Sequence, residues 1–542
     1  MLGLMQTHPL LISSLIMSAE RHHADGEIVS RRVEGGIHRY TWRDVARRSR
    51  QLARALDATD LLFSDRVATL AWNGYRHLEL YVGVSGSGRV LHTINPRLPP
   101  DQIAWIANHA EDQVLCFDLT FLPLIKAIQA SCKSIRKYVA LCDADDLPAD
   151  SGIPNLVSYE AWMGEQSDQY RWPTFDENTA SSMCYTSGTT GNPKGVLYSH
   201  RSTLLHAFGI PLPDALDLSA TGVILPVVPM FHVNAWGIPY SAMLTGCKLV
   251  LPGPAMDGKS IYELVEAEGV TCAAGVPTIW QMLLTHVQSQ DLRFRTLRKL
   301  VIGGAAVNSA MVKGFEERGA EVFHVWGMTE TSPLGTAYAP KAKHLALDPE
   351  QLHALRLKQG RVGFGIDMRI IGADGKEAPW DGQTFGDLQV KGYWVLSEYF
   401  KGEGGNPLDE DGWFRTGDVA TIDADGFMQI TDRSKDVIKS GGEWISSIEV
   451  ENIAMSHPDV QMAACIGMPH PKWGERPIVV VVRRPGSNVT REAVLGFYQD
   501  KAAKWQVPDD VVFVDTIPIG ATGKMLKTKL REILKDYVLP AV

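Results

Sequence analysis

The chain has 542 residues, in which 53 lysines and arginines face 62 aspartates and glutamates, giving a formal net charge of −9 at pH 7. This length exceeds what a single hydrophobic core usually supports, so we expect two or more domains. The mild acidic excess gives no sign of a nucleic-acid partner or of a polybasic membrane patch, and small-molecule partners are the expectation.

The N-terminal segment MLGLMQTHPLLISSLIMSAERHH predicts an amphipathic docking helix rather than a secretion signal. A secretion signal begins with basic residues and has an unbroken apolar stretch, whereas Ser13, Ser14 and Ser18 interrupt this one. No run of the chain reaches the roughly eighteen apolar residues of a membrane span. Seven scattered cysteines without a C-x-x-C pair argue against a zinc site or a disulfide framework. We therefore expect a soluble, cytoplasmic protein without an integral membrane span.

Short apolar or β-branched runs alternate with longer helix-like segments along much of the chain. Thus DRVATLAW precedes HLELYVGVSGSGRV within residues 65–90, and KLVIGGAAV precedes SAMVKGFEERG within residues 299–319. Runs of this kind predict buried strands and helices in turn. Their alternation is typical of α/β domains that contain parallel sheets.

The segment YTSGTTGNPKGVLYSH, residues 185–200, predicts a phosphate-binding loop. Its glycines let the backbone approach an anion closely, and hydroxyl donors stand beside Lys194. The Walker pattern requires Gly-Lys-Ser/Thr, whereas here Pro193 precedes the lysine and Gly195 follows it. A polar surface turn is the alternative, but so many hydroxyls and glycines in one run favour phosphate binding.

Two carboxylates further along the chain are candidates for nucleotide and metal binding. In HVWGMTETS, residues 324–332, Glu330 follows a predicted buried strand, where it could hold Mg²⁺ against phosphate oxygens. In WFRTGDVA, residues 413–420, Asp418 could accept both hydroxyls of a ribose. Taken singly, the first could be a solvated glutamate and the second a turn-forming aspartate.

The sequence changes character near residue 430, where Asp-Gly turns and short strands become frequent. We predict a large domain over 1–431, a hinge over 432–436 and a small C-terminal domain over 437–542. The basic residues of DRSKDVIKSGGEWIS and the lysine of PIGATGKMLK could each be ordinary surface charge when considered alone. The tail that follows predicts an amphipathic helix.

Taken together and in this order, these motifs resemble the adenylate-forming superfamily of acyl-CoA synthetases, luciferases and peptide-synthetase adenylation domains. The resemblance runs from about residue 30 to the C-terminus. It implies an α/β fold in which a large N-terminal domain of β-sheets with packed helices carries a small, mobile α+β C-terminal lid. It also implies a two-step reaction with ATP, Mg²⁺ and coenzyme A. A carboxylate forms acyl-AMP, and a thiol then releases AMP.

The resemblance assigns roles to individual residues. Lys524 would bridge the substrate carboxylate and the α-phosphate, acting as a catalytic residue together with Glu330 and Thr186. Thr186 and Glu330 would also serve the metal. The nucleotide would contact Thr186, Ser187, Gly188, Thr189, Thr190, Lys194, Gly304, Ala305, Ala306, Trp326, Gly327, Met328, Thr329, Asp418 and Arg433.

The same resemblance places the hinge at Lys435, so that the lid swings between the two half-reactions. Residues near coenzyme A would then be Lys439, Gly441, Gly442 and Trp444. The loop GRVGFGIDMRI lacks the proline that many relatives carry, so the resemblance assigns no contact to residues 361–366.

Within the superfamily, PMFHVNAWGIPY, residues 229–240, resembles the fatty-acyl branch, in which a tryptophan gates the acyl tunnel. Trp236 would be this gate, and His232, Gly303 and Gly327 would accompany it at the substrate. Core packing is the alternative for the two aromatic residues.

The chain most resembles the bacterial medium-chain acyl-CoA ligases, and among them the 3-methylmercaptopropionyl-CoA ligases of dimethylsulfoniopropionate breakdown. The preferred substrate is therefore predicted to be 3-methylthiopropionate, and a homodimer is expected. The alternatives are a medium- or long-chain fatty acid ligase, an adenylation enzyme with another acceptor, a luciferase-like oxygenase, and a nucleotide-binding regulator without turnover.

Overall fold

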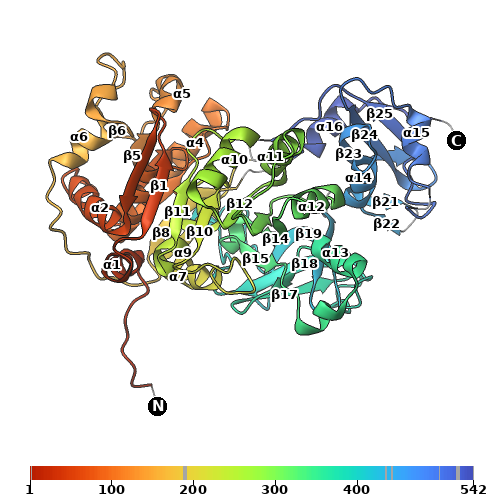
Figure 1. Ribbon diagram of the computed structural model, residues 1–542, viewed down its shortest axis with the longest axis horizontal. Coiled ribbons are helices and arrows are strands. Elements are labelled where there is room, and N and C mark those ends of the chain that lie inside the picture. The colour runs from red at the N-terminus through yellow and green to blue at the C-terminus, as the bar shows by residue number, and fades with distance from the viewer. Residues whose placement is uncertain are drawn as a thin grey trace.

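The computed structural model describes residues 1, 3–186, 192–433, 436–440, 443–499, 501–520 and 525–540, apart from the side chains of residues 443 and 444. Within these ranges the strands form four sheets. Figure 1 shows that the C-terminal part of the chain lies at one end of an elongated molecule, opposite the first strands and helices. No helix of the described residues is long and apolar enough to cross a membrane.

The seven-stranded sheet carries the predicted phosphate loop at one edge. Its neighbouring strands are parallel except for the last pair, which forms an antiparallel hairpin. Residues 67–70 of β3, VATL, are all buried, as expected where helices cover both faces of a parallel sheet. In order the strands are β7 (Leu156–Ser158), β6 (Lys137–Ala140), β5 (Asp112–Phe117), β3 (Arg66–Leu70), β4 (Val90–Thr93), β8 (Ala180–Tyr185) and β9 (Gly195–Ser199).

The nine-stranded sheet carries the predicted nucleotide residues 304–306 and 326–329 at the carboxyl ends of β13 and β14. Its six central strands are parallel, and β2, β15 and β16 are antiparallel to their neighbours. Ligands of open α/β sheets bind at this edge. The order is β16 (Arg361–Val362), β15 (Leu334–Ala337), β14 (Glu321–Gly327), β13 (Lys299–Ile302), β12 (Cys272–Gly275), β10 (Val223–Pro226), β11 (Lys248–Leu251), β1 (Glu27–Arg31) and β2 (Ile37–Thr41).

Two smaller sheets follow along the chain. An antiparallel sheet consists of β17 (Ile366–Ile371), β18 (Gly386–Gly392), β19 (Phe414–Ile422) and β20 (Met428–Arg433). A five-stranded sheet consists of β22 (Glu443–Ile445), β21 (Ile438–Ser440), β24 (Gly474–Arg483), β23 (Val460–His470) and β25 (Asp510–Phe513). Every strand of the second sheet comes after residue 437, so it forms a structural unit of its own at the end of the molecule (Figure 1).

The helices fill the spaces beside these sheets. The predicted N-terminal helix is present as α1, whose Ile12, Leu15 and Ile16 are buried. The helices are α1 (Ile12–His22), α2 (Trp42–Asp57), α3 (Tyr75–Gly86), α4 (Pro100–Ala110), α5 (Leu122–Ile128), α6 (Tyr159–Gly164), α7 (His200–Gly209), α8 (Val233–Trp236), α9 (Ile238–Thr245), α10 (Gly258–Glu268), α11 (Pro277–Ser289), α12 (Ser309–Glu316), α13 (Pro349–Leu357), α14 (Ser447–Met455), α15 (Arg491–Gly496) and α16 (Lys527–Ile533).

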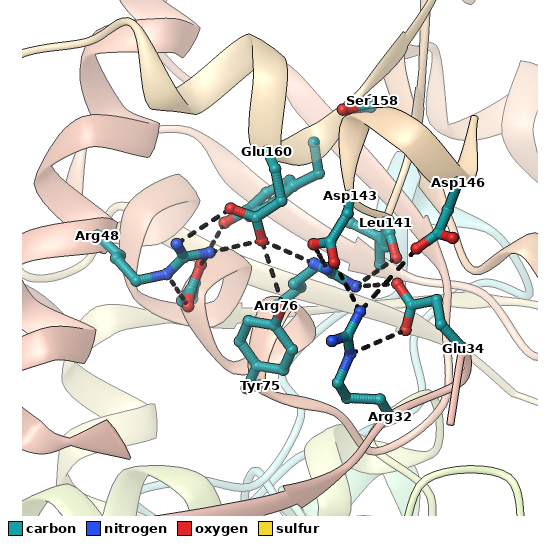
Figure 2. Close-up of polar contacts among 12 residues, drawn as sticks. Arg32, Glu34, Arg48, Tyr75, Arg76, Leu141, Asp143, Asp146, Ser158 and Glu160 are labelled. Atoms are coloured by element: carbon teal, nitrogen blue, oxygen red, sulfur yellow. Dashed lines mark hydrogen bonds and ion pairs between the residues drawn. The ribbon is translucent and has the colours of Figure 1, made fainter. Parts of the chain in front are cut away.

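A network of ion pairs fastens α2, α3 and α6 to one another beside the seven-stranded sheet (Figure 2). Arg48 of α2 donates to Glu79 of α3 at 2.7 Å and to Glu160 of α6 at 2.9 Å. Arg76 of α3 donates to Glu160 at 2.8 Å and to Asp143 at 2.6 Å. Because Glu79 is fully buried, loss of its arginine would leave an uncompensated charge in the interior.

Candidate active site

The ends of the predicted phosphate loop are closed by two backbone donors. The Thr186 N–H donates to the Lys194 carbonyl at 2.9 Å, and the Lys194 N–H donates to the Thr186 hydroxyl at 3.2 Å. These bonds extend the β8–β9 hairpin, in which Tyr185 is opposite Gly195. The hairpin lies at the edge of the sheet, and Thr186 and Lys194 directly adjoin its paired strands. The predicted contacts of Ser187, Gly188, Thr189 and Thr190 lie outside the described residues.

Glu330 is held in a short 3₁₀ turn, Thr329–Thr331, directly after β14. The Tyr198 hydroxyl donates to the Thr329 carbonyl at 2.8 Å, which ties this turn to β9 of the phosphate hairpin. The Leu396 N–H donates to the Glu330 carbonyl at 2.8 Å. Glu330 is only 7% exposed, so its carboxylate has a largely fixed environment.

Tyr399 joins Glu330 and the loop lysine. Its hydroxyl donates to the Glu330 carboxylate at 2.8 Å, and the Lys194 ammonium lies 4.7 Å from the centre of its ring. Burial, followed by the negative charge of Glu330, raises the pKa of Tyr399. The phenol is therefore protonated at neutral pH and acts as the donor. Glu330 and Lys194, which were both predicted as site residues, thus contact the side chain of Tyr399, which was not.

The residues of this region fit a magnesium ion bound together with phosphate. Mg²⁺ prefers hard oxygen ligands and is usually held by one or two carboxylates plus substrate phosphates. Glu330 supplies one buried carboxylate, and Thr186 supplies a hydroxyl at the base of the loop. Among the described residues, no cluster of three or more His, Cys, Asp or Glu could hold a metal alone.

The predicted ribose site is assembled from three segments. The Trp326 indole N–H donates to one Asp418 carboxylate oxygen at 3.0 Å, and Arg433 Nε lies 2.9 Å from the other. Asp418 and Arg433 are opposite each other on β19 and β20. Asp418 is 3% exposed. A buried carboxylate with two fixed donors keeps its remaining lone pairs for a ligand.

The loop after β13 and the segment after β14 lie at the same sheet edge. Gly304 has φ +84°, a conformation that favours glycine, and the adjoining Ala305 is exposed at that edge. A Cβ on Gly327 would overlap the Pro333 carbonyl, so the backbone approach there requires glycine. Ala306 and Met328 are half-buried at the same edge.

Trp236 lies against Gly303 on the predicted acyl side. A Cβ on Gly303 would be 3.2 Å from Cη2 of the indole, so only glycine leaves the ring its full space. Trp236 is 9% exposed. His232 directly precedes α8 (Val233–Trp236), which carries Trp236. The backbone N–H of His232 donates to the Pro229 carbonyl at 3.0 Å.

Trp236 is carried by a left-handed turn that sequence reasoning did not anticipate. Val233, Asn234, Ala235 and Trp236 have φ values of 45°, 51°, 49° and 57°. Such backbone costs roughly 1–2 kcal/mol per residue, so tertiary contacts must hold it. Asn234 supplies one, because its amide donates to the Ser182 hydroxyl on β8 at 2.9 Å. Asparagine tolerates positive φ better than most residues, and this is the one local signal that the sequence offers.

The residues predicted for the hinge and for coenzyme A are placed only in part. Lys435, Gly441, Gly442 and Lys524 lie outside the described residues. Lys439 of β21 is opposite Trp444 of β22, and its N–H donates to Glu475 at 2.9 Å. In Figure 1, β21 and β22 lie in the C-terminal unit, whereas β14 lies in the middle of the molecule.

Comparisons with known proteins show the family of the chain. The family model described as AMP-binding enzyme matches residues 17–400, and its C-terminal domain matches residues 449–524. The chain is 52% identical to the 3-methylmercaptopropionyl-CoA ligase of Ruegeria lacuscaerulensis, covering 99% of each chain. It is 50% identical to the medium-chain-fatty-acid–CoA ligase of Ectopseudomonas oleovorans, covering 99% of this chain and 98% of the relative.

Solved structures show the same fold at lower identity. An anthranilate CoA ligase in complex with anthranoyl-AMP has a TM-score of 0.85 and 23% identity, covering 97% of this chain and 98% of that one. ATP-bound MatB from Rhodopseudomonas palustris has a TM-score of 0.82 and 24% identity, covering 98% and 99%. These likenesses confirm the predicted α/β fold with a large N-terminal and a small C-terminal domain. The chain belongs to the AMP-binding enzyme family.

Proposed function

We propose that this protein is an ATP-dependent, AMP-forming acyl-CoA ligase. The observation that carries this proposal is the identity of 52% over essentially the whole chain with a relative named 3-methylmercaptopropionyl-CoA ligase. In the first step, a carboxylate oxygen of the acid attacks the α-phosphorus of ATP, and pyrophosphate leaves. In the second step, the thiol of coenzyme A attacks the acyl carbon of acyl-AMP, and AMP leaves.

The residues of the site are suited to positioning and charge neutralisation, which supply most of the rate in transfers at phosphorus. Lys194 and Thr186 would contact the phosphates, and Asp418 would accept the ribose hydroxyls, because Trp326 and Arg433 already hold its carboxylate in place. Held by Glu330 and Thr186, Mg²⁺ would neutralise negative charge on the phosphates when bound.

The C-terminal lid would serve the two steps in turn. Lys524 would lie between the acid and the α-phosphate during the first step, where it offsets the repulsion between two anions. Rotation about Lys435 would then replace it with the segment that contains Lys439 and Trp444, beside coenzyme A. This part of the proposal rests on the motif resemblance alone.

For the acid, we propose 3-methylthiopropionate as the preferred substrate, with butyrate and hexanoate also used. Trp236 lies against Gly303, and an indole that keeps this place across the acyl tunnel would admit only a short chain in front of it. A thioether sulfur packs well against an aromatic ring. Discrimination in such a pocket is about 1–3 kcal/mol per methylene, so related short acids are expected to react.

The direct test is AMP release from ATP and coenzyme A with a panel of acids of graded length. The proposal predicts the highest kcat/KM for 3-methylthiopropionate and the C4 to C6 acids, with acetate and palmitate well behind. A maximum at C8 or at C12 and longer would instead favour a medium- or long-chain ligase, the functions named for relatives at 50% and 46% identity. AMP release that does not need coenzyme A would indicate another acceptor.

A further inference from the structure

Residues 398–405, which we term the clasp segment, lie against the phosphate hairpin from the loop between β18 and β19. The Lys401 ammonium donates to the Glu111 carboxylate at 2.7 Å and to the His109 carbonyl at 2.9 Å. The His109 side chain is contacted as well, because its imidazole Nε2 lies 3.2 Å from the Glu403 carboxylate. These bonds to the end of α4 anchor the clasp segment to the seven-stranded sheet, on which the hairpin is also built.

Within the clasp segment, Tyr399 is the residue that contacts both charged groups of the phosphate site. Its hydroxyl hydrogen bond to Glu330 is 2.8 Å long, and its ring lies 4.7 Å from the Lys194 ammonium. Neighbouring packing leaves little freedom here, because Gly195 lies against the Phe400 side chain, and Gly404 lies against the Lys194 side chain. One side chain therefore connects the carboxylate and the cation that ATP must meet.

We propose that Tyr399 is a positioning residue of the phosphate site, whose hydroxyl orients the Glu330 carboxylate and whose ring holds the Lys194 ammonium until ATP binds. The inference rests on the proposed function, in which Glu330 serves Mg²⁺ and Lys194 serves phosphate. Tyr399 does not belong to any of the motifs. Its contact with Glu330 and its contact with Lys194 should have two separately measurable effects on ATP binding.

The two contacts differ in how they respond to ATP. A cation–π contact is weaker than a charge-assisted hydrogen bond to phosphate, so the ammonium can transfer from the ring to the nucleotide. Until then the ring restrains a flexible four-carbon side chain and reduces the rotamer entropy lost on binding. The hydroxyl bond to Glu330 remains compatible with a metal, because a carboxylate has a second oxygen for the ion.

Two substitutions separate these effects. Tyr399→Phe keeps the ring and removes the hydroxyl, whereas Tyr399→Leu removes both. Tyr393→Phe is the matched control, because Tyr393 is an exposed tyrosine near the end of β18. Each variant is titrated with ATP by calorimetry, first without divalent metal and then with Mg²⁺, in the absence of acid and coenzyme A. The Mn²⁺ signal of the Mn·ATP complex is followed by electron paramagnetic resonance.

For Tyr399→Phe we expect unchanged metal-free ATP affinity and a loss of about tenfold in the affinity gain that Mg²⁺ provides, the size of one hydrogen bond to a charged group. Tyr399→Leu should in addition weaken metal-free ATP binding several-fold. Combining Tyr399→Phe with Glu330→Gln should cause no further loss of metal coupling beyond Glu330→Gln alone, because the hydroxyl acts through Glu330. Tyr393→Phe should match the unmodified protein.

The inference is overturned if Tyr399→Phe lowers ATP affinity equally with and without Mg²⁺, leaves both unchanged, or adds its effect independently to Glu330→Gln. Failure of the proposed function has a different signature. In that case the unmodified protein does not bind ATP, or Glu330→Gln leaves the metal coupling intact. Near-ultraviolet circular dichroism of each variant separates these outcomes from misfolding, and a misfolded Tyr399→Leu leaves the test on Tyr399→Phe in place.

Discussion

Replacing Asp418 with asparagine tests the ribose site, because the substitution keeps the side-chain shape and removes the charge. The carboxylate is 3% exposed and already accepts the Trp326 indole N–H at 3.0 Å, with Arg433 2.9 Å away. In Asp418→Asn, the amide nitrogen must face one of these donors or the ribose. One donor, on Trp326, on Arg433 or on the ribose, is then left without its acceptor.

The structure sets the size of the effect. Hydrogen bonds to charged groups are worth about 1.5–3 kcal/mol each, and asparagine retains one acceptor oxygen where two ribose hydroxyls require a carboxylate. We therefore expect ATP binding to weaken by about 2–3 kcal/mol, which corresponds to roughly 30- to 150-fold in Kd.

The assay compares two ligands by equilibrium titration in the presence of Mg²⁺. ATP carries the ribose, whereas inorganic tripolyphosphate carries only phosphates and should bind Asp418→Asn as it binds the unmodified protein. Asp411→Asn, at an exposed aspartate in the turn before β19, is the control and should change neither affinity. Equal losses for both ligands, or an unchanged ATP affinity, would refute the assignment of Asp418 to ribose.

Four further substitutions test other parts of the account. Trp236→Ala should shift the optimum of kcat/KM toward longer acids, and an unchanged profile across the acid panel would remove Trp236 from the tunnel. Lys524→Ala should slow acyl-AMP formation by about a hundredfold or more, while thioester formation from added acyl-AMP changes much less; equal losses would contradict the swinging lid. Arg48→Leu leaves the buried Glu79 without its cation and should cost about 3–5 kcal/mol of unfolding free energy in a denaturant titration, so a loss below 1 kcal/mol would show that the pair contributes little. Burial raises the pKa of Asp118 to about 7. The stability that its protonated form provides is therefore present at low pH and is lost as the pH rises through 7. The melting temperature of Asp118→Asn, measured relative to the unmodified protein, should accordingly rise from pH 5 to pH 8.

The sequence predicted the residues that are proposed to contact the ligand, but not the residue that holds one of them in place. Glu330, Asp418 and Arg433 stand in motifs because the chemistry proposed for them requires a residue type at a fixed place in a strand–turn unit. Tyr399 has no comparable local signal, since its hydrogen bond to Glu330 spans 69 positions of the chain. The strand order of the sheets was equally hidden, because β4 pairs with β8 although three other strands of the same sheet, β5, β6 and β7, lie between them in the sequence.

The turn that carries Trp236 shows a second limit. Val233 and Trp236 are residue types that avoid positive φ, so local preference argues against the conformation that the structure contains. Asn234 stabilises it through Ser182, a residue 52 positions earlier. Tertiary contacts thus override local propensity at the site where the acyl chain is proposed to lie, as is common where strain serves function.

Transfer of oxygen from the acid to AMP tests the proposed reaction most directly. The reaction is run with ATP, coenzyme A and 3-methylthiopropionate that carries ¹⁸O in both carboxylate positions, and AMP is analysed by mass spectrometry. Attack of the carboxylate on the α-phosphorus predicts one ¹⁸O atom in each AMP, with pyrophosphate as the other product and an acyl-CoA thioester that retains one ¹⁸O. Unlabelled AMP, or ADP and phosphate as products, would contradict an adenylate intermediate.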